Sequence, residues 1–141
     1  MNTFYEDYRY LIVPITVWTL IQLFKVLYDR VETKKWHWKR MFGAGGMPSA
    51  HSATVMTVTV LIAKYVGIKT PLFALSMVFA FVVMYDAAGV RRAVGKQAKV
   101  LNDIIQDHNM TNAQKLQEMT GHTPIQVTVG AIIGLIAGLL G

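Results

Sequence analysis

The run GGMPSAHS at positions 45–52 places a histidine, His51, at the start of an apolar segment. If a helix begins there, its first N–H groups lack partners within the helix and its dipole is positive at that end, so this turn favours an anion such as phosphate. The hydroxyl of Ser49 is placed to add a donor. The alternative is that Ser49 and Ser52 only cap the helix and that His51 only lies at an interface.

A second histidine, His122, stands in the run GHTPIQV at positions 121–127, again before an apolar segment. His122 and Gln126 are four residues apart, so they share a helix face and can hydrogen-bond if the ring lies in the first turn. An imidazole has a pKa of about 6.5, so both of its protonation states are accessible near neutral pH. That property suits proton transfer and nucleophilic attack.

An acid and two arginines end a third apolar segment, in the run YDAAGVRR at positions 85–92. An aspartate at the edge of an apolar helix is costly unless it is paired, and Arg91 or Arg92 is the obvious partner for Asp86. Two guanidinium groups also suit a doubly charged phosphate, because each presents a planar fork of donors. The alternative is that the arginines only anchor the helix at the cytoplasmic side of a membrane.

Four apolar segments must position these groups, at residues 8–28, 48–66, 71–90 and 123–140. Each approaches the roughly 20 residues that a helix needs to cross a bilayer core of about 30 Å. The chain has 141 residues, of which 53% are hydrophobic and 16% charged, so it is too apolar for most soluble domains. We therefore expect one integral membrane domain over residues 1–141, with His51, Asp86 and His122 on one side of the bilayer.

The predicted fold is an all-α polytopic bundle of about four transmembrane helices, with an amphipathic helix between the third and the fourth. Apolar residues at spacings of four, three and four indicate that helix: Val94, Ala98, Leu101 and Ile105. We expect it to lie on the membrane surface or over the site. A second short helix is predicted near residues 111–119, where a threonine precedes a glutamine by three residues in a capping-box pattern.

Glycines and basic residues predict packing and orientation. Gly130, Gly134 and Gly138 form a smooth face on the last segment, which favours close packing of a neighbouring helix or a homodimer. The most basic loops follow the first and third segments, so the positive-inside rule places these loops and the site at the cytoplasmic face. The net charge of +6 does not indicate nucleic-acid binding, because the basic residues lie between apolar blocks. The chain has no cysteine, which excludes disulfides and thiolate sites.

The runs PSAHS and GHTPIQV resemble motifs of the type 2 phosphatidic acid phosphatase superfamily, which also includes vanadium-dependent haloperoxidases. Over residues 45–134 the sequence resembles a divergent bacterial branch of small membrane proteins, described as acid phosphatase/vanadium-dependent haloperoxidase-related. Typical runs of that branch, such as YDAAGVRR and GKQA, are present. The resemblance implies a multi-pass protein of the bacterial cell membrane that acts on a lipid phosphate. It implies no cofactor, with vanadate expected only as a phosphate mimic.

The same resemblance implies roles for the residues of the site. His122 corresponds to the nucleophile that forms a phosphohistidine, and His51 to the general acid that protonates the leaving oxygen. Asp86 and Gln126 complete the predicted catalytic group. The predicted phosphate-binding residues are Ser49, Lys34, Lys35, Arg40, Arg91, Arg92 and Lys96.

The sequence departs from the superfamily pattern at three places. The usual first motif, a lysine followed seven residues later by Arg-Pro, is absent, because Lys34 lies six residues before Arg40 and no proline follows. Leu116 takes the place of an arginine six residues before the nucleophile. Gln126 replaces the aspartate that orients the nucleophile, and an amide supplies no negative charge unless Asp86 takes over that task.

The leading hypothesis is a membrane lipid-phosphate phosphatase acting on a phosphomonoester or a diphosphate. Two other classes stay open: a phospholipid-binding or lipid-moving protein that keeps the pocket without turnover, and a helix-packing subunit that uses the glycine face. A zinc site of His51, His122 and Asp86 is a further alternative, although no metal-binding spacing supports it.

Overall fold

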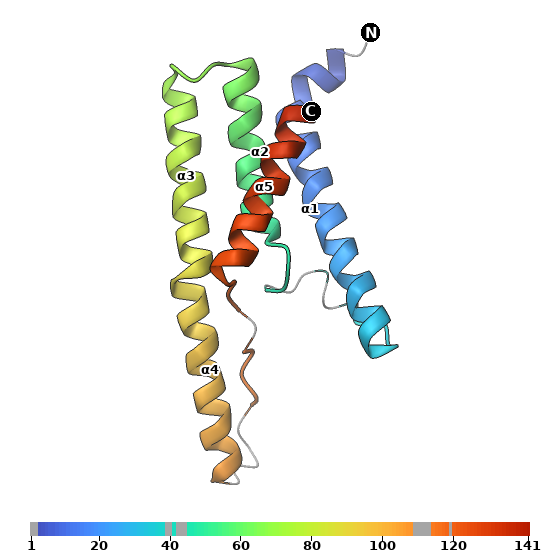
Figure 1. Cartoon of the computed structure of the whole chain (residues 1–141), viewed down its shortest axis with the longest axis vertical. Helices are drawn as coiled ribbons and strands as arrows, with labels where there is room; N and C mark the ends of the chain where they lie inside the picture. Colours follow the sequence, from blue (N-terminus) through green and yellow to red (C-terminus); the bar gives the residue numbers. More distant parts are fainter. Residues whose placement is uncertain (1–2, 39–40, 42–44, 109–113, 119) are drawn as a thin grey trace.

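The computed structural model describes residues 3–38, 41, 45–108, 114–118 and 120–141. These residues form five helices and no strand. The helices are α1 (Thr3–Thr33), α2 (Ala50–Tyr65), α3 (Pro71–Ala88), α4 (Val90–Asp107) and α5 (Pro124–Leu140). Figure 1 shows α1, α2, α3 and α5 side by side, with both chain ends at the same end of the bundle. The predicted all-α helix bundle is confirmed, including the helix between the third and fourth apolar segments.

Local sequence explains where the helices begin. Thr70 and Thr123 adopt extended backbone conformations, and each hydroxyl accepts a hydrogen bond from the backbone N–H of the residue three positions later. A proline occupies the first helical position in both cases. At Thr123 the side chain of Gln126 also accepts from the cap backbone, which completes a capping box. Ser49 caps α2 in the same way. The predicted starts at residues 48, 71 and 123 therefore lie within two residues of the observed ones.

The bundle surface is strongly apolar, which is the opposite of a soluble helical domain. Only Ala80 and Ala87 of α3 are buried. Large apolar side chains are exposed along α1, α3 and α5, among them Leu11, Ile15, Leu75, Phe79, Phe81, Ile132, Ile136 and Leu139. By length and composition, two helical stretches are apolar enough to cross a bilayer: Phe4–Thr33 within α1, and Pro71–Asp107, which joins α3 and α4. A helix that is apolar all round and not covered by protein needs lipid as its solvent, so the fold is a membrane helix bundle.

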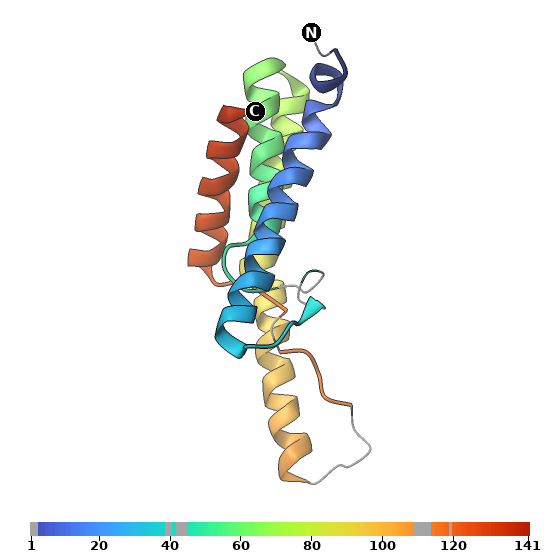
Figure 2. The ribbon, with the colours of Figure 1, turned by 90° about the vertical axis from the view of Figure 1, so that its right-hand side faces the viewer.

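The helix α2 lies at the centre of the bundle and packs closely against α5 (Figure 2). The contact uses the glycine face of α5: Gly130 lies on the carbonyl of Ser49, Gly134 on the carbonyl of Ala53, and Gly138 on Val60. Any Cβ at these glycines would collide with its neighbour. The predicted close packing is therefore present, but the prediction that this face forms a homodimer is wrong, because α2 of the same chain covers it.

The helix α4 continues in the direction of α3 and projects beyond the ends of the other helices (Figure 1). Of its predicted apolar stripe only Ala98 is buried, and Val94 and Leu101 are exposed. The described part of the returning chain, residues 114–118 and 120–121, runs back along α4 as an extended segment. The predicted second short helix is therefore absent over residues 114–118, and its threonine at position 111 lies outside the described residues.

One asparagine holds that returning segment. Asn102 is buried and its amide donates to the carbonyl of Leu116 (2.9 Å) and to the carboxylate of Glu118 (2.8 Å), while its oxygen accepts from the N–H of Leu116 (2.8 Å). Further on, the Thr120 hydroxyl donates to the carbonyl of Arg91 (3.1 Å). These bonds replace the backbone partners that a helix would supply, so the segment is fixed without secondary structure.

The glycine contact gives a first prediction. Gly134→Ala places a methyl group against the carbonyl of Ala53 and should destabilise the bundle by about 1–3 kcal/mol, the usual cost of overpacking. Thermal unfolding in detergent measures it. Ile132→Ala, a larger change at an exposed position of the same helix, should have the smaller effect. Equal melting temperatures for wild type and Gly134→Ala would contradict the packing.

The asparagine clamp gives a second prediction. Asn102→Ala removes three hydrogen bonds and should free the returning segment, since each lost bond leaves a partner unsatisfied at a cost of about 1–3 kcal/mol. Hydrogen exchange at the amide of Leu116 should accelerate. Gln97→Ala, exposed on the same helix, is the matched control and should leave that exchange rate unchanged.

Candidate functional site

A cavity of about 240 Å³ brings together the two histidines that the sequence singled out. Its lining comes from the start of α2, the end of α3, the start of α4 and the segment before α5: His51, Val82, Val83, Asp86, Ala87, Arg91, Thr120 and His122. The expected juxtaposition of His51 and His122 at one end of the bundle is therefore present. An acid, a guanidinium and two imidazoles face one small space, together with two valines of α3.

The approach of the two histidines depends on a link between α2 and α5. Gly45 and Gly46 have φ values of 99° and 81°, a backbone region that favours glycine, and lead the chain into α2. The N–H of Ser49 then donates to the carbonyl of Gln126 in the first turn of α5 (3.1 Å). Because each histidine lies within a few residues of this bond, the bond holds the two backbone segments that carry the rings close together.

Ser49 itself does not face the cavity. It has no exposed surface, and its hydroxyl oxygen accepts from the Ser52 hydroxyl (2.9 Å) and from the Ser52 N–H (3.3 Å). The prediction that Ser49 donates to phosphate is therefore not supported by the geometry, and the alternative of a helix cap describes it.

His122 is the buried member of the histidine pair. It is 3% exposed, whereas His51 is exposed, and its backbone N–H donates to the carbonyl of Ala87 at the end of α3 (3.0 Å). Burial lowers the pKa of His122 below its usual value, and the positive charge of Lys25 lowers it further. Interactions with the Gln126 side chain and the Gly46 backbone act in the opposite direction. The balance favours a neutral imidazole, the form with a nucleophilic nitrogen.

Gln126 is occupied by the helix cap rather than by the ring of His122. Its side-chain oxygen accepts from the N–H of Thr123 (3.0 Å). Among the described residues, Nδ1 of His122 is buried and has no hydrogen-bond partner. Gln126 therefore lies near His122 but does not hydrogen-bond to Nδ1 of its ring. That buried nitrogen has no partner in the described part of the chain.

The charged pair on the cavity wall is the one expected from the sequence. Nε of Arg91 donates to Oδ2 of Asp86 at 2.6 Å. Both side chains are partly exposed and both line the cavity. Arg91 keeps further N–H donors beyond the one used by Asp86. The pair therefore sets a guanidinium beside the histidines without burying an uncompensated charge.

Lys25 is the residue of the site that sequence reasoning missed. A lysine near the end of an apolar segment usually extends to the lipid headgroups, but Lys25 is 6% exposed and its Nζ donates to the carbonyl of Gly45 (3.1 Å). Its charge acts on both His51 and His122. The signal was its position three residues after Gln22, which is also buried and donates to the carbonyl of Met41 (2.8 Å).

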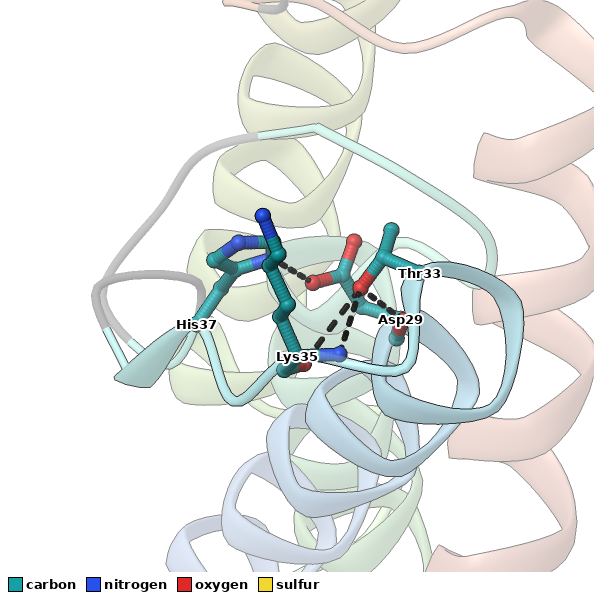
Figure 3. Close-up of polar contacts among 4 residues, drawn as sticks. All are labelled: Asp29, Thr33, Lys35 and His37. Atoms are coloured by element: carbon teal, nitrogen blue, oxygen red, sulfur yellow. Dashed lines mark hydrogen bonds and ion pairs between the residues drawn. The ribbon is translucent and has the colours of Figure 1, made fainter.

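The other predicted phosphate-binding residues lie outside this cavity. Arg92 and Lys96 line a separate hollow together with Lys99 and Glu118. Lys34 and Lys35 are exposed at the end of α1, where Lys35 belongs to a hydrogen-bonded turn with Asp29, Thr33 and His37 (Figure 3). Arg40 lies outside the described residues. Among the described residues, the cations near the histidines are therefore Arg91 and Lys25, and the role of Arg40 stays a prediction.

A metal centre finds no support in the described part of the chain. There, no group of three or more His, Cys, Asp or Glu side chains is arranged to hold a metal ion. The alternative of zinc between His51, His122 and Asp86 therefore lacks the required geometry.

Comparison with known proteins identifies the family of the chain. No solved structure matches the chain. A curated relative from Bacillus subtilis (strain 168), described as uncharacterized membrane protein YuiD, is 35% identical over 133 residues, which cover 84% of each chain. The model of the Divergent PAP2 family matches residues 7–137, a range that contains every residue of the cavity together with Lys25. The chain is a member of the Divergent PAP2 family.

Proposed function

We propose that this protein is a membrane phosphatase that hydrolyses a phosphomonoester or diphosphate on a lipid through a phosphohistidine intermediate. The observation that carries the proposal is the shared cavity, in which His51 and His122 face the same space as the guanidinium of Arg91. Two imidazoles and a cation at one small cavity suit attack on phosphorus, protonation of a leaving group and neutralisation of phosphoryl charge.

In the first step a neutral ring nitrogen of His122 attacks phosphorus, and the bond from phosphorus to the lipid oxygen breaks. The leaving oxygen takes a proton from His51, which becomes neutral. In the second step His51 accepts a proton from water as the water oxygen attacks phosphorus, and the bond from phosphorus to His122 breaks. Inorganic phosphate and the lipid alcohol, or the lipid monophosphate from a diphosphate, are the products, and both imidazoles return to their initial states.

Exposure to water, which differs between the two rings, divides the proposed roles between the histidines. The nucleophile must be unprotonated, and His122 has its pKa lowered by burial and by Lys25. The proton donor must exchange protons with water, and His51 is the exposed ring. The charge of the transition state would meet the guanidinium of Arg91 in the cavity wall and the longer-range field of Lys25.

The apolar setting supports a lipid substrate over a soluble one. The cavity has a valine wall on α3, and the outer faces of α3 and α5 are covered by exposed apolar side chains. A phosphate attached to a lipid can reach the cavity while its chain stays in the bilayer. The proposed location is a cell membrane, with the site at the cytoplasmic face according to the distribution of lysine and arginine.

The decisive prediction concerns His122. His122→Ala removes the proposed nucleophile and should lower phosphate release from phosphatidate, phosphatidylglycerophosphate or a prenyl diphosphate by about a thousandfold or more. A phosphate assay on purified protein measures it, with vanadate expected to inhibit the wild type. His108→Ala, an exposed histidine at the end of α4, is the matched control and should retain full activity.

Release that persists in His122→Ala would refute the phosphohistidine. If no substrate of this panel gives histidine-dependent release but lipid phosphate still binds, a lipid-binding protein without turnover is the better description. The unpartnered Nδ1 of His122 is the observation that favours this second candidate, because the aspartate that usually orients the ring is a glutamine here.

A further prediction concerns pH. Protonation of His122 removes the nucleophile, so kcat/KM should fall as the pH drops through its lowered pKa. Lys25→Met removes a positive charge that disfavours the protonated ring, so the pKa of His122 rises and the acid limb of the profile should move to higher pH. Lys64→Met, at the opposite end of α2, should leave the limb in place. A limb that stays fixed in Lys25→Met would show that Lys25 does not act on His122.

A further inference from the structure

A second and larger cavity opens between α1 and α5, away from α3. It has a volume of about 640 Å³, within the range of small-molecule sites. Apolar residues from both helices line it, Leu20 and Phe24 on α1 and Val129 and Ile133 on α5. Lys25 is the one charged residue of its described lining. Apart from Lys25, no residue of this lining has a role in the proposed catalytic steps.

The groove results from the way α1 and α5 diverge (Figure 1). At the end that carries the chain termini the two helices touch, because Gly141 lies against Val13 and its carbonyl accepts from the Tyr5 hydroxyl (3.3 Å). Toward the other end they separate, and the loop with Met47 and Pro48 fills only part of the space. The groove is therefore a wedge whose wide end lies beside that loop.

The wide end of the wedge meets the histidine site. Gly46 lines the groove and its backbone interacts with the ring of His122. Lys25 also lines the groove, donates to the carbonyl of Gly45 and acts electrostatically on both histidines. An elongated molecule with an anionic end can thus have its charge at Lys25 and His122 and its apolar part between α1 and α5.

We infer that this groove holds one hydrocarbon chain of the substrate and selects for long chains. The inference rests on the proposed function and adds to it the position of the chain. Charge complementarity identifies the occupant: the described lining holds one cation, Lys25, among mostly apolar residues, and its charge acts on the proposed nucleophile. The bilayer is as apolar as the groove, so moving the chain from one to the other removes it from no water. The groove would instead favour catalysis by fitting the chain closely and aligning the phosphate with His122.

The test compares two phosphomonoesters of the same chemistry, butyl phosphate and hexadecyl phosphate. Val129→Trp fills the groove from α5, and Leu20→Trp fills it from α1. Each should lower kcat/KM for hexadecyl phosphate by about tenfold or more, the scale on which an apolar pocket discriminates size, while butyl phosphate turnover stays within about twofold of wild type. Ile132→Trp, exposed and outside the groove lining, is the matched control and should change neither value.

The outcomes separate this inference from the proposed function. Histidine-dependent release with no change in chain preference in either tryptophan variant overturns the groove and leaves the phosphatase intact. An equal loss for both substrates in both variants also overturns it, because the groove would then only support the fold. If neither phosphate is hydrolysed, the phosphatase fails, and calorimetric binding of hexadecylphosphonate decides the groove: weaker binding in Val129→Trp but not in Ile132→Trp supports it, and equal binding overturns it.

Discussion

The close contact between α2 and α5 is the constraint on which the site depends. Three glycines let the two backbones approach, and the hydrogen bond from the Ser49 N–H to the Gln126 carbonyl fixes their relative register. His51 follows Ser49 by two residues and His122 precedes Gln126 by four, so this register also brings the imidazoles together. In a lipid solvent, which supplies no hydrophobic drive between helices, such packing must come from shape and from backbone bonds.

Two polar side chains of α1, Gln22 and Lys25, are buried in the bundle, and hydrogen bonds to the chain offset the free-energy cost of burying them. Gln22 and Lys25 point from an apolar helix into protein rather than into lipid, and each donates to a loop carbonyl that has no partner in a helix. The loop is thereby fixed by α1 as well as by α5. The same lysine lowers the pKa of His122, so one side chain both secures the loop and keeps the ring neutral.

Sequence predicted the parts of this structure that depend on local patterns. Apolar segments of membrane length, capped by threonine and proline, gave the helices, and histidines at segment ends gave the two main residues of the cavity. Residues whose role depends on tertiary packing were missed or misplaced. Lys25 belongs to no motif. In the sequence, nothing distinguishes Arg91 from the other predicted cations Lys34, Lys35, Arg92 and Lys96, and only the fold shows that Arg91 lines the histidine cavity. The returning segment was predicted as helix from a local capping-box pattern, whereas its hydrogen bonds come from Asn102, a partner that the local pattern does not reveal.

The replacement of aspartate by Gln126 becomes understandable once the fold is known. A carboxylate at that position would stand in the first turn of α5 beside a ring that burial already favours as neutral. An amide completes the capping box with Thr123 without adding charge. The backbone carbonyl of the same residue accepts from the N–H of Ser49. The negative charge of the site then lies at Asp86, where it pairs with Arg91 instead of with the imidazole. The pKa of His122 is therefore lowered mainly by burial and by the positive charge of Lys25, while the charge of Arg91 is balanced by Asp86 at its side.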